Sequence, residues 1–191
     1  METKPLTGDI LDAARRLLVE EGYDSLSMRK IAGEVGCKAA TIYYYYKNKD
    51  AIVDALVEEG NRLHYRIAKE IASKHTHPLL RFEALLWTSL EFGLNNPSYF
   101  EILYLLQQHG APADSQKSRM IPGQELGEQA LRDAVADGLI KIDNPGVVSA
   151  TCFAMLSGVI VGVLRGHFFS QHDLESVKRE TIRRIMGSLK E

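Results

Sequence analysis

The chain has 191 residues, 45% of them hydrophobic and 25% charged, which is typical of a globular protein with a sizeable core. Its formal net charge of -2 excludes the strongly basic balance of a protein that contacts nucleic acid over its whole surface. Cys37 and Cys152 lie far apart and outside any Cys-x-x-Cys pattern, so we expect neither a disulfide framework nor a zinc site. Without a signal-peptide pattern at the N-terminus, a reducing cytoplasm fits best.

Helical spacing of apolar residues dominates the first fifty residues, and alternating strand patterns are absent. We predict a first helix over residues 9–21, closed by Gly22. Ser27 is expected to cap a second helix over 28–35, which Gly36 ends in a left-handed turn. A short third helix follows over 39–45. The predicted inward residues of the first two helices are Ile10, Ala13, Ala14, Leu17, Leu18, Met28, Ile31, Ala32 and Val35.

A capped helix, a glycine turn and a second short helix form the signature of a helix-turn-helix, whose second helix enters the major groove of DNA. Between Ser27 and Lys49 five basic residues accompany one acid, Glu34, so this stretch is net +4 inside a net negative chain. Phosphate contact requires such a local basic patch. The sequence therefore predicts a DNA-binding domain over residues 1–50.

The rest of the chain, residues 51–191, reads as a helical bundle domain, which makes the fold all-α with about nine helices. A long fourth helix spans 49–73 and connects the two halves. The predicted later helices cover 79–94, 97–109, 124–137 and 145–169, and the last begins at Asp173; the segment 110–119 is a loop.

The apolar run from Val147 to Leu164 approaches the length that crosses a bilayer. It contains hydroxyl side chains, is bounded by Asp143 and Arg165, and has neither a second span nor a basic flanking loop. We therefore expect a helix buried on nearly all sides and no membrane partner.

The segment from Ser27 to Leu56, SMRKIAGEVGCKAATIYYYYKNKDAIVDAL, closely resembles the DNA-binding signature of the TetR family of transcriptional regulators. The resemblance implies an all-α C-terminal domain that dimerises and binds a small-molecule effector. Phe92 to Leu103 is also similar to a segment in some branches of that family. Lys38 departs from the pattern, because a small hydroxyl residue often caps the recognition helix there, and Ala40 and Tyr46 replace the usual glycine and phenylalanine.

The resemblance places Arg29 and Lys30 near the DNA backbone and groove edge, and Tyr43 and Lys49 at phosphates. Arginine matches the O6/N7 edge of guanine, alanine touches a thymine methyl, and tyrosine hydroxyls bond phosphates or bases. The alternative interpretation of the tyrosine run, Tyr43 to Tyr46, is a stripe of buried aromatic side chains. Four consecutive tyrosines cannot all face inward on one helix, however. The predicted DNA-contacting residues are Ser27, Arg29, Lys30, Lys38, Ala39, Thr41, Tyr43, Tyr44, Tyr45 and Lys49.

Gly158, Gly162 and Gly166 repeat every four residues along the apolar eighth helix and predict a smooth strip where another helix approaches closely. Packing within the chain is one interpretation. The resemblance favours a subunit interface that includes Ile182 and Ile185 of the last helix, since a dimer reads two half-sites.

An aromatic set in the C-terminal half predicts a pocket for an apolar, aromatic or acyl-bearing effector, with ordinary core packing as the alternative. Its members are Phe82, Leu86, Trp87, Leu90, Phe100, Leu103, Tyr104, Gln107, Phe153 and Leu156. His75 and His77 lack acidic or cysteine neighbours, so we assign no metal, and no cofactor motif occurs.

The sequence thus predicts a homodimeric regulator, a repressor that binds pseudo-palindromic operator DNA and responds to an apolar effector. The sequence contains no nucleophile-elbow, HExxH or phosphate-loop motif, so nothing in it supports enzyme activity. A helical adaptor that binds only protein is the alternative, in which the basic cluster around Lys38 is a solvated face.

Overall fold

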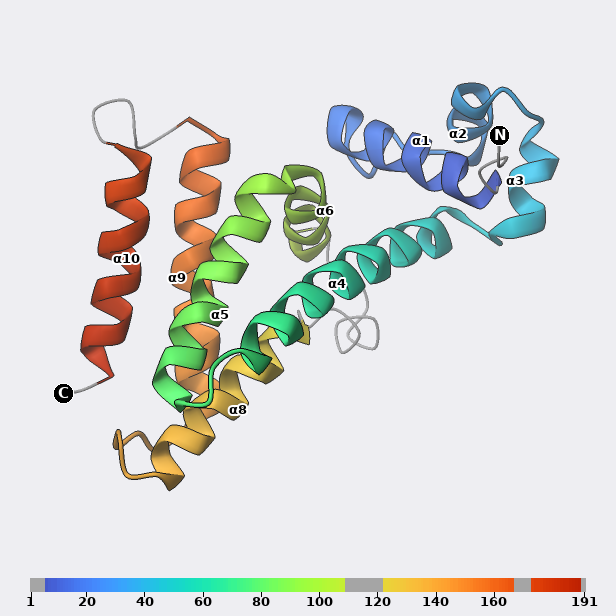
Figure 1. The fold of residues 1–191 in the computed structure, drawn as a ribbon. Coiled ribbons are helices and arrows are strands. Elements are labelled where there is room, and N and C mark those ends of the chain that lie inside the picture. Colours follow the sequence, from blue (N-terminus) through green and yellow to red (C-terminus); the bar gives the residue numbers. More distant parts are fainter. Residues whose placement is uncertain (1–5, 109–121, 167–172, 190–191) are drawn as a thin grey trace. The chain divides into compact units, whose positions relative to one another are not determined.

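A computed structural model describes residues 6–108, 122–166 and 173–189 of the chain (Figure 1). These described ranges hold nine helices and no strand, so the all-α prediction is confirmed. The helices are α1 (Leu6–Glu21), α2 (Met28–Val35), α3 (Ala39–Tyr45), α4 (Lys49–Ser73), α5 (Pro78–Asn95), α6 (Pro97–Gln108), α8 (Pro122–Ala136), α9 (Pro145–Leu164) and α10 (Leu174–Ser188). Prolines begin four of them, because the first helical position needs no N–H donor.

The chain divides into two compact units. The first comprises Met1–Gly60 and Ser98–Arg119, and the second comprises Asn61–Pro97 and Met120–Glu191. The long helix α4 therefore contributes residues to both units. The domain boundary at residue 50 follows the helix-turn-helix motif alone and stays a prediction.

The first unit has a core of buried aliphatic side chains from α1, α2, α3, α4 and the middle of α6. The inward faces predicted for α1 and α2 are confirmed, except that Val35 is only half-buried. Each buried leucine or isoleucine stabilises the fold by about 1.5 to 3 kcal/mol relative to exposure. The residues with no exposed surface in this core are Ile10, Ala14, Leu18, Ile31, Ile42, Ile52, Leu56 and Ile102.

Local capping fixes the turn between α2 and α3. The Lys30 N–H donates to Ser27 Oγ at 3.3 Å, which confirms the predicted N-cap. Gly36 has a φ of 75°, a left-handed conformation that glycine adopts without steric cost, and it ends α2 as predicted. Lys38 precedes α3 and makes no side-chain capping hydrogen bond.

In the second unit α5, α8 and α9 pack against one another in all three pairs, and α10 packs on α5 and α9 (Figure 1). Gly93 on α5 permits close approach of α9, because a Cβ added there would lie 2.5 Å from Ile160 Cδ1. The buried apolar side chains of this layer include Phe82, Leu85, Leu86, Leu90, Leu131, Phe153, Leu156 and Ile160.

Helix α9 is long and apolar enough to cross a membrane by length and composition alone, and it is the one such helix among the described residues. Core helices of soluble proteins pass the same test. Only 33% of its most apolar window is buried, so the prediction of a helix buried on nearly all sides is wrong for the single chain. The predicted end near residue 169 is also wrong, because the helix ends at Leu164 and Gly166 follows with a φ of 66°.

Candidate functional site

Helix α3, the predicted recognition helix, presents three consecutive tyrosines to solvent. Tyr43, Tyr44 and Tyr45 are 56%, 85% and 42% exposed, whereas Ile42 is completely buried. The rings of Tyr44 and Tyr45 meet edge to face with centroids 5.2 Å apart. Tyr46 is half-buried, and burial raises the pKa of its hydroxyl. The interpretation of the whole tyrosine run as a core stripe is therefore wrong, since only its last member turns inward.

Three exposed cations have no ion pair among the described residues: Arg29 on α2, and Lys38 and Lys47 on either side of α3. Glu34 is the single acid of the basic stretch, and Arg16 of α1 pairs with it. Lys30 is instead paired with Glu21. Because exposed pairs contribute little and exchange readily, the surface around α3 keeps a net positive charge for an anionic partner.

Lys49 is positioned by contacts that the sequence did not reveal. Its ammonium donates to the Tyr23 carbonyl oxygen at 3.1 Å and lies 4.1 Å from the centroid of the Tyr23 ring. The Tyr23 hydroxyl donates to Asp50, and burial, followed by this hydrogen bond and charge, raises the pKa of Tyr23 to about 12. The cluster joins the α1–α2 turn to the start of α4, where Asn48 Oδ1 accepts from the Ala51 N–H at 2.9 Å.

The remaining predicted DNA contacts are less exposed. Ser27 is half-buried and its hydroxyl caps α2, while Ala39 and Thr41 are also half-buried. The structure thus brings the predicted set onto one short helix and its flanks, with the tyrosines and unpaired cations outermost. Their roles in DNA contact stay predictions.

The residues of the predicted pocket lie in different places in the described part of the chain. Phe82, Leu86, Leu90, Phe153 and Leu156 are buried core residues. Phe100 belongs to the first unit. The side chains of Leu103, Tyr104 and Gln107 lie outside those described. Trp87 alone of the set lines a described groove.

That groove runs between α4 and α5 in the second unit and has a volume of about 640 Å³. This volume suits a small ligand, and the walls are mostly apolar with a few polar groups, as in ligand sites. The lining residues are Ile67, Ile71, His75, Ala84, Trp87, Thr88, Glu91, Phe92, Asn95 and Asn96. Sequence reasoning found only Trp87, because the contribution of α4 depends on how two helices pack.

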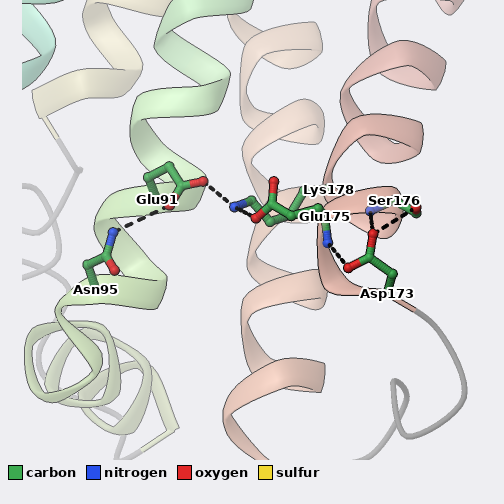
Figure 2. A network of polar contacts seen from close by, with 6 residues as sticks. All are labelled: Glu91, Asn95, Asp173, Glu175, Ser176 and Lys178. Carbon is green, nitrogen blue, oxygen red and sulfur yellow. Dashed lines mark hydrogen bonds and ion pairs between the residues drawn. The ribbon is translucent and has the colours of Figure 1, made fainter.

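A polar network at the edge of this groove holds α10 against α5 (Figure 2). Lys178 is 5% exposed and pairs with Glu91 of α5 and with Glu175 at 2.6 Å. Asp173 caps α10 by accepting from the N–H groups of Glu175 and Ser176 at 3.3 and 3.2 Å. Two carboxylates thereby compensate the burial of one ammonium.

A second groove, of about 770 Å³, lies between α9 and α10. Of the predicted interface residues, Gly158 and Ile185 line it. A Cβ added at exposed Gly158 would meet no atom within 4 Å. Gly162 and Ile182 are buried within the chain, and Gly166 lies beyond the end of α9, so the predicted three-glycine strip is not continuous on the surface.

Comparison with known protein families finds a match in the N-terminal part of the chain. The family described as "Bacterial regulatory proteins, tetR family" matches residues 10–56, which include α2 and α3. The class D tetracycline repressor protein of Escherichia coli is 37% identical over 76 residues, which cover 40% of this chain and 35% of that protein. The chain therefore matches about a third of the length of that repressor.

One further relative and one solved structure match over most of the chain. The HTH-type transcriptional regulator UidR of Escherichia coli K12 is 25% identical over 176 residues, 85% of this chain and 82% of that protein. The solved structure of the TetR family transcriptional regulator PfmR from Thermus thermophilus has a TM-score of 0.73, with 18% identity over 95% of this chain and 99% of that one. This likeness shows that the two chains share a fold.

Proposed function

The chain belongs to the TetR family of transcriptional regulators, a non-enzymatic family, and from this premise we propose that it is a cytoplasmic repressor that binds pseudo-palindromic operator DNA as a homodimer. An apolar small molecule bound in the second unit changes its operator affinity. Helix α4 contributes residues to both units and is the element through which the effect travels.

The exposed tyrosines of α3 beside the unpaired cations are the observation that carries the DNA-binding proposal. Tyr44 is 85% exposed, an unusual position for an aromatic ring unless it meets a partner. Arg29, Lys38 and Lys47 supply charge for phosphates, and Arg29 also fits a guanine edge. A protein-only adaptor would need no such combination of hydroxyls and cations around one short helix.

The apolar surface of α9 supports the dimer. Val147 and Met155 are 59% and 52% exposed, and the groove between α9 and α10 adds further apolar surface. Covering such a surface with the same surface of a second copy is the usual solution in symmetric oligomers. In a dimer, the two copies of the short recognition helix contact two half-sites of the operator.

The test is fluorescence anisotropy of DNA taken from upstream of the protein's own gene, titrated at several salt concentrations. We expect specific binding whose affinity falls steeply with salt, because each neutralised phosphate releases counterions. Tyr44→Ala should reduce specific binding. Lys74→Ala, a change at an exposed lysine on the second unit, is the matched control and should leave binding unchanged. Equal binding to operator and unrelated DNA would contradict the proposal.

A further inference from the structure

Two polar side chains of α4 are buried inside the second unit with an atom left unpartnered. Asn61 is 6% exposed and His64 is 3% exposed. Among the described residues, Asn61 Oδ1 and His64 Nδ1 have no hydrogen-bond partner. Buried polar atoms are nearly always paired, so an unpaired one needs a reason. The two residues are three apart on one helix, which places them on the same face within reach of a single small group.

The His64 ring is held in place from two other helices. Its Nε2 lies 3.1 Å from Ser89 Oγ, and its ring meets Phe92 edge-on with centroids 4.9 Å apart. Gly123, in the first turn of α8, leaves no room for a side chain, because an added Cβ would overlap His64 Cε1. Burial lowers the pKa of His64 to about 4, so the ring is neutral at pH 7.

Asn61 and His64 do not line the groove between α4 and α5, but they lie one to two turns before its lining residues on α4. Ile67 and Ile71 line the groove and continue the helical stripe that begins with Asn61 and His64. Phe92 belongs to both places, since it lines the groove and contacts the His64 ring. Phe92 therefore links the apolar groove to the residue pair that holds the two unpaired hydrogen-bonding atoms.

We propose that Asn61 and His64 form the polar end of the effector site, and that the effector carries an uncharged hydroxyl group on an apolar, aromatic body. This inference rests on the proposed effector-responsive function and specifies its ligand. The body occupies the groove beside Trp87, and the hydroxyl reaches the pair on α4.

The hydroxyl follows from the donors and acceptors present. Asn61 Oδ1 can only accept hydrogen bonds, so the ligand must donate a hydrogen bond to it. In the tautomer that carries its proton on Nδ1, His64 Nε2 accepts from the Ser89 hydroxyl, 3.1 Å away, and a ligand hydroxyl that donates to Asn61 Oδ1 accepts from Nδ1–H. A carboxylate has no proton for Asn61 Oδ1, and its charge would enter a site where the imidazole is neutral. A methyl group would leave both atoms unpaired.

The experiment compares three probes of one shape, β-naphthol, β-methylnaphthalene and β-naphthoate, by calorimetric titration into the full chain. We expect β-naphthol to bind at least about tenfold more tightly than the other two. Asn61→Leu and His64→Phe should abolish that preference. His77→Phe, at an exposed histidine outside the groove lining, is the matched control and should keep it. Equal affinity for the three probes, tighter binding of the acid, or binding of none would overturn the inference.

A second measurement needs no ligand. If the pair is kept unpaired for an effector, Asn61→Leu should raise the thermal midpoint of the free protein, because a buried unpaired oxygen is removed. If a buried water satisfies the pair structurally, both Asn61→Leu and the smaller change Asn61→Ala should lower the midpoint, which would overturn the inference.

Operator binding separates this inference from the proposed function. A β-naphthol complex with unchanged operator affinity contradicts regulation alone, whereas operator release by β-methylnaphthalene and β-naphthol alike contradicts the polar site alone.

Discussion

The guanidinium of Arg15 on α1 lies over the ring of Tyr99 on α6, 4.9 Å from its centroid. Arg15 also pairs with Glu59 of α4 at 2.5 Å and with Asp12 at 2.8 Å. All four residues belong to the first unit, so one arginine joins three helices there. Tyr99 sits directly against α4, because a Cβ added at Gly60 would lie 2.8 Å from Tyr99 Cδ1.

Gly60→Ala is therefore expected to destabilise the chain by about 1 to 3 kcal/mol, since the Tyr99 ring must move to accept the methyl group. Urea denaturation measures the change. Gly33→Ala is the matched control, because Gly33 is an exposed residue inside α2 with no atom within 4 Å of an added Cβ. It should stabilise by up to about 1 kcal/mol through helix propensity. Equal effects of the two changes would contradict the tight contact at Gly60.

The uncapped start of α3 predicts a trade between stability and DNA affinity. Lys38→Ser introduces a hydroxyl that can accept an N–H of the first turn, which should add about 0.5 to 2 kcal/mol to the free energy of unfolding. The same change removes a cation, so the slope of log affinity against log salt should fall by about 0.9 for each lost phosphate contact. Urea denaturation measures the change in stability, and anisotropy titrations measure the change in DNA affinity. Unchanged affinity would remove Lys38 from the DNA contacts.

The features predicted well from the sequence are those that depend on near neighbours in the chain. Ser27 caps the residue three positions later and Gly36 ends the same helix, so both could be read locally. The partners of Lys49 and His64 could not be predicted in this way. Tyr23 and Ser89 lie 26 and 25 residues away along the chain and meet them only through tertiary packing. The exposed side of α9 was missed because its apolar residues lie all round the helix, which gives no periodicity to separate a buried face from an exposed one.

Substitutions on α2, on α3 and just after α3 should separate base contacts from phosphate contacts. Tyr44→Ala and Arg29→Ala should each lower operator preference by about 1 to 3 kcal/mol if a base contact is lost. Lys47→Ala should weaken operator and unrelated DNA about equally, since an exposed unpaired lysine contacts phosphate without reading sequence. Competition titrations against both DNAs measure the difference. A uniform loss in all three variants would show that α3 reads no bases.

Lys49→Ala should differ from Lys47→Ala in stability. Its ammonium holds the Tyr23 carbonyl and ring, so its removal should cost about 1 kcal/mol or more of unfolding free energy in addition to DNA affinity. Lys47 is exposed and has no ion pair among the described residues, so its removal should leave stability unchanged. Urea denaturation of the two variants measures this contrast. Equal stability would mean that the Lys49 cluster is only a surface contact.

The proposed subunit interface is best tested at Gly158. A Cβ added there has no described atom within 4 Å, so Gly158→Leu should fold normally and yet separate the dimer. Gly162→Leu should instead destabilise the fold, because Gly162 is already buried in the single chain. Sedimentation reports association and circular dichroism reports folding. If Gly158→Leu remains a dimer, the groove between α9 and α10 is not the interface.

The stability of the protein should depend on pH through His64. Its pKa of about 4 in the folded chain lies below the ordinary 6.5, so below pH 6.5 the unfolded chain binds a proton that the folded chain does not. This contribution is fully present above pH 6.5 and is lost as the pH falls towards 4, by up to about 3 kcal/mol. The ring neighbours Ser89, Phe92 and Gly123 are not titratable in this range, so the effect belongs to His64. Urea denaturation at pH 7 and pH 5 should show a smaller loss of stability in His64→Phe than in the wild type. Equal pH dependence in the two proteins would mean that the imidazole is reached by water and protons in the folded state.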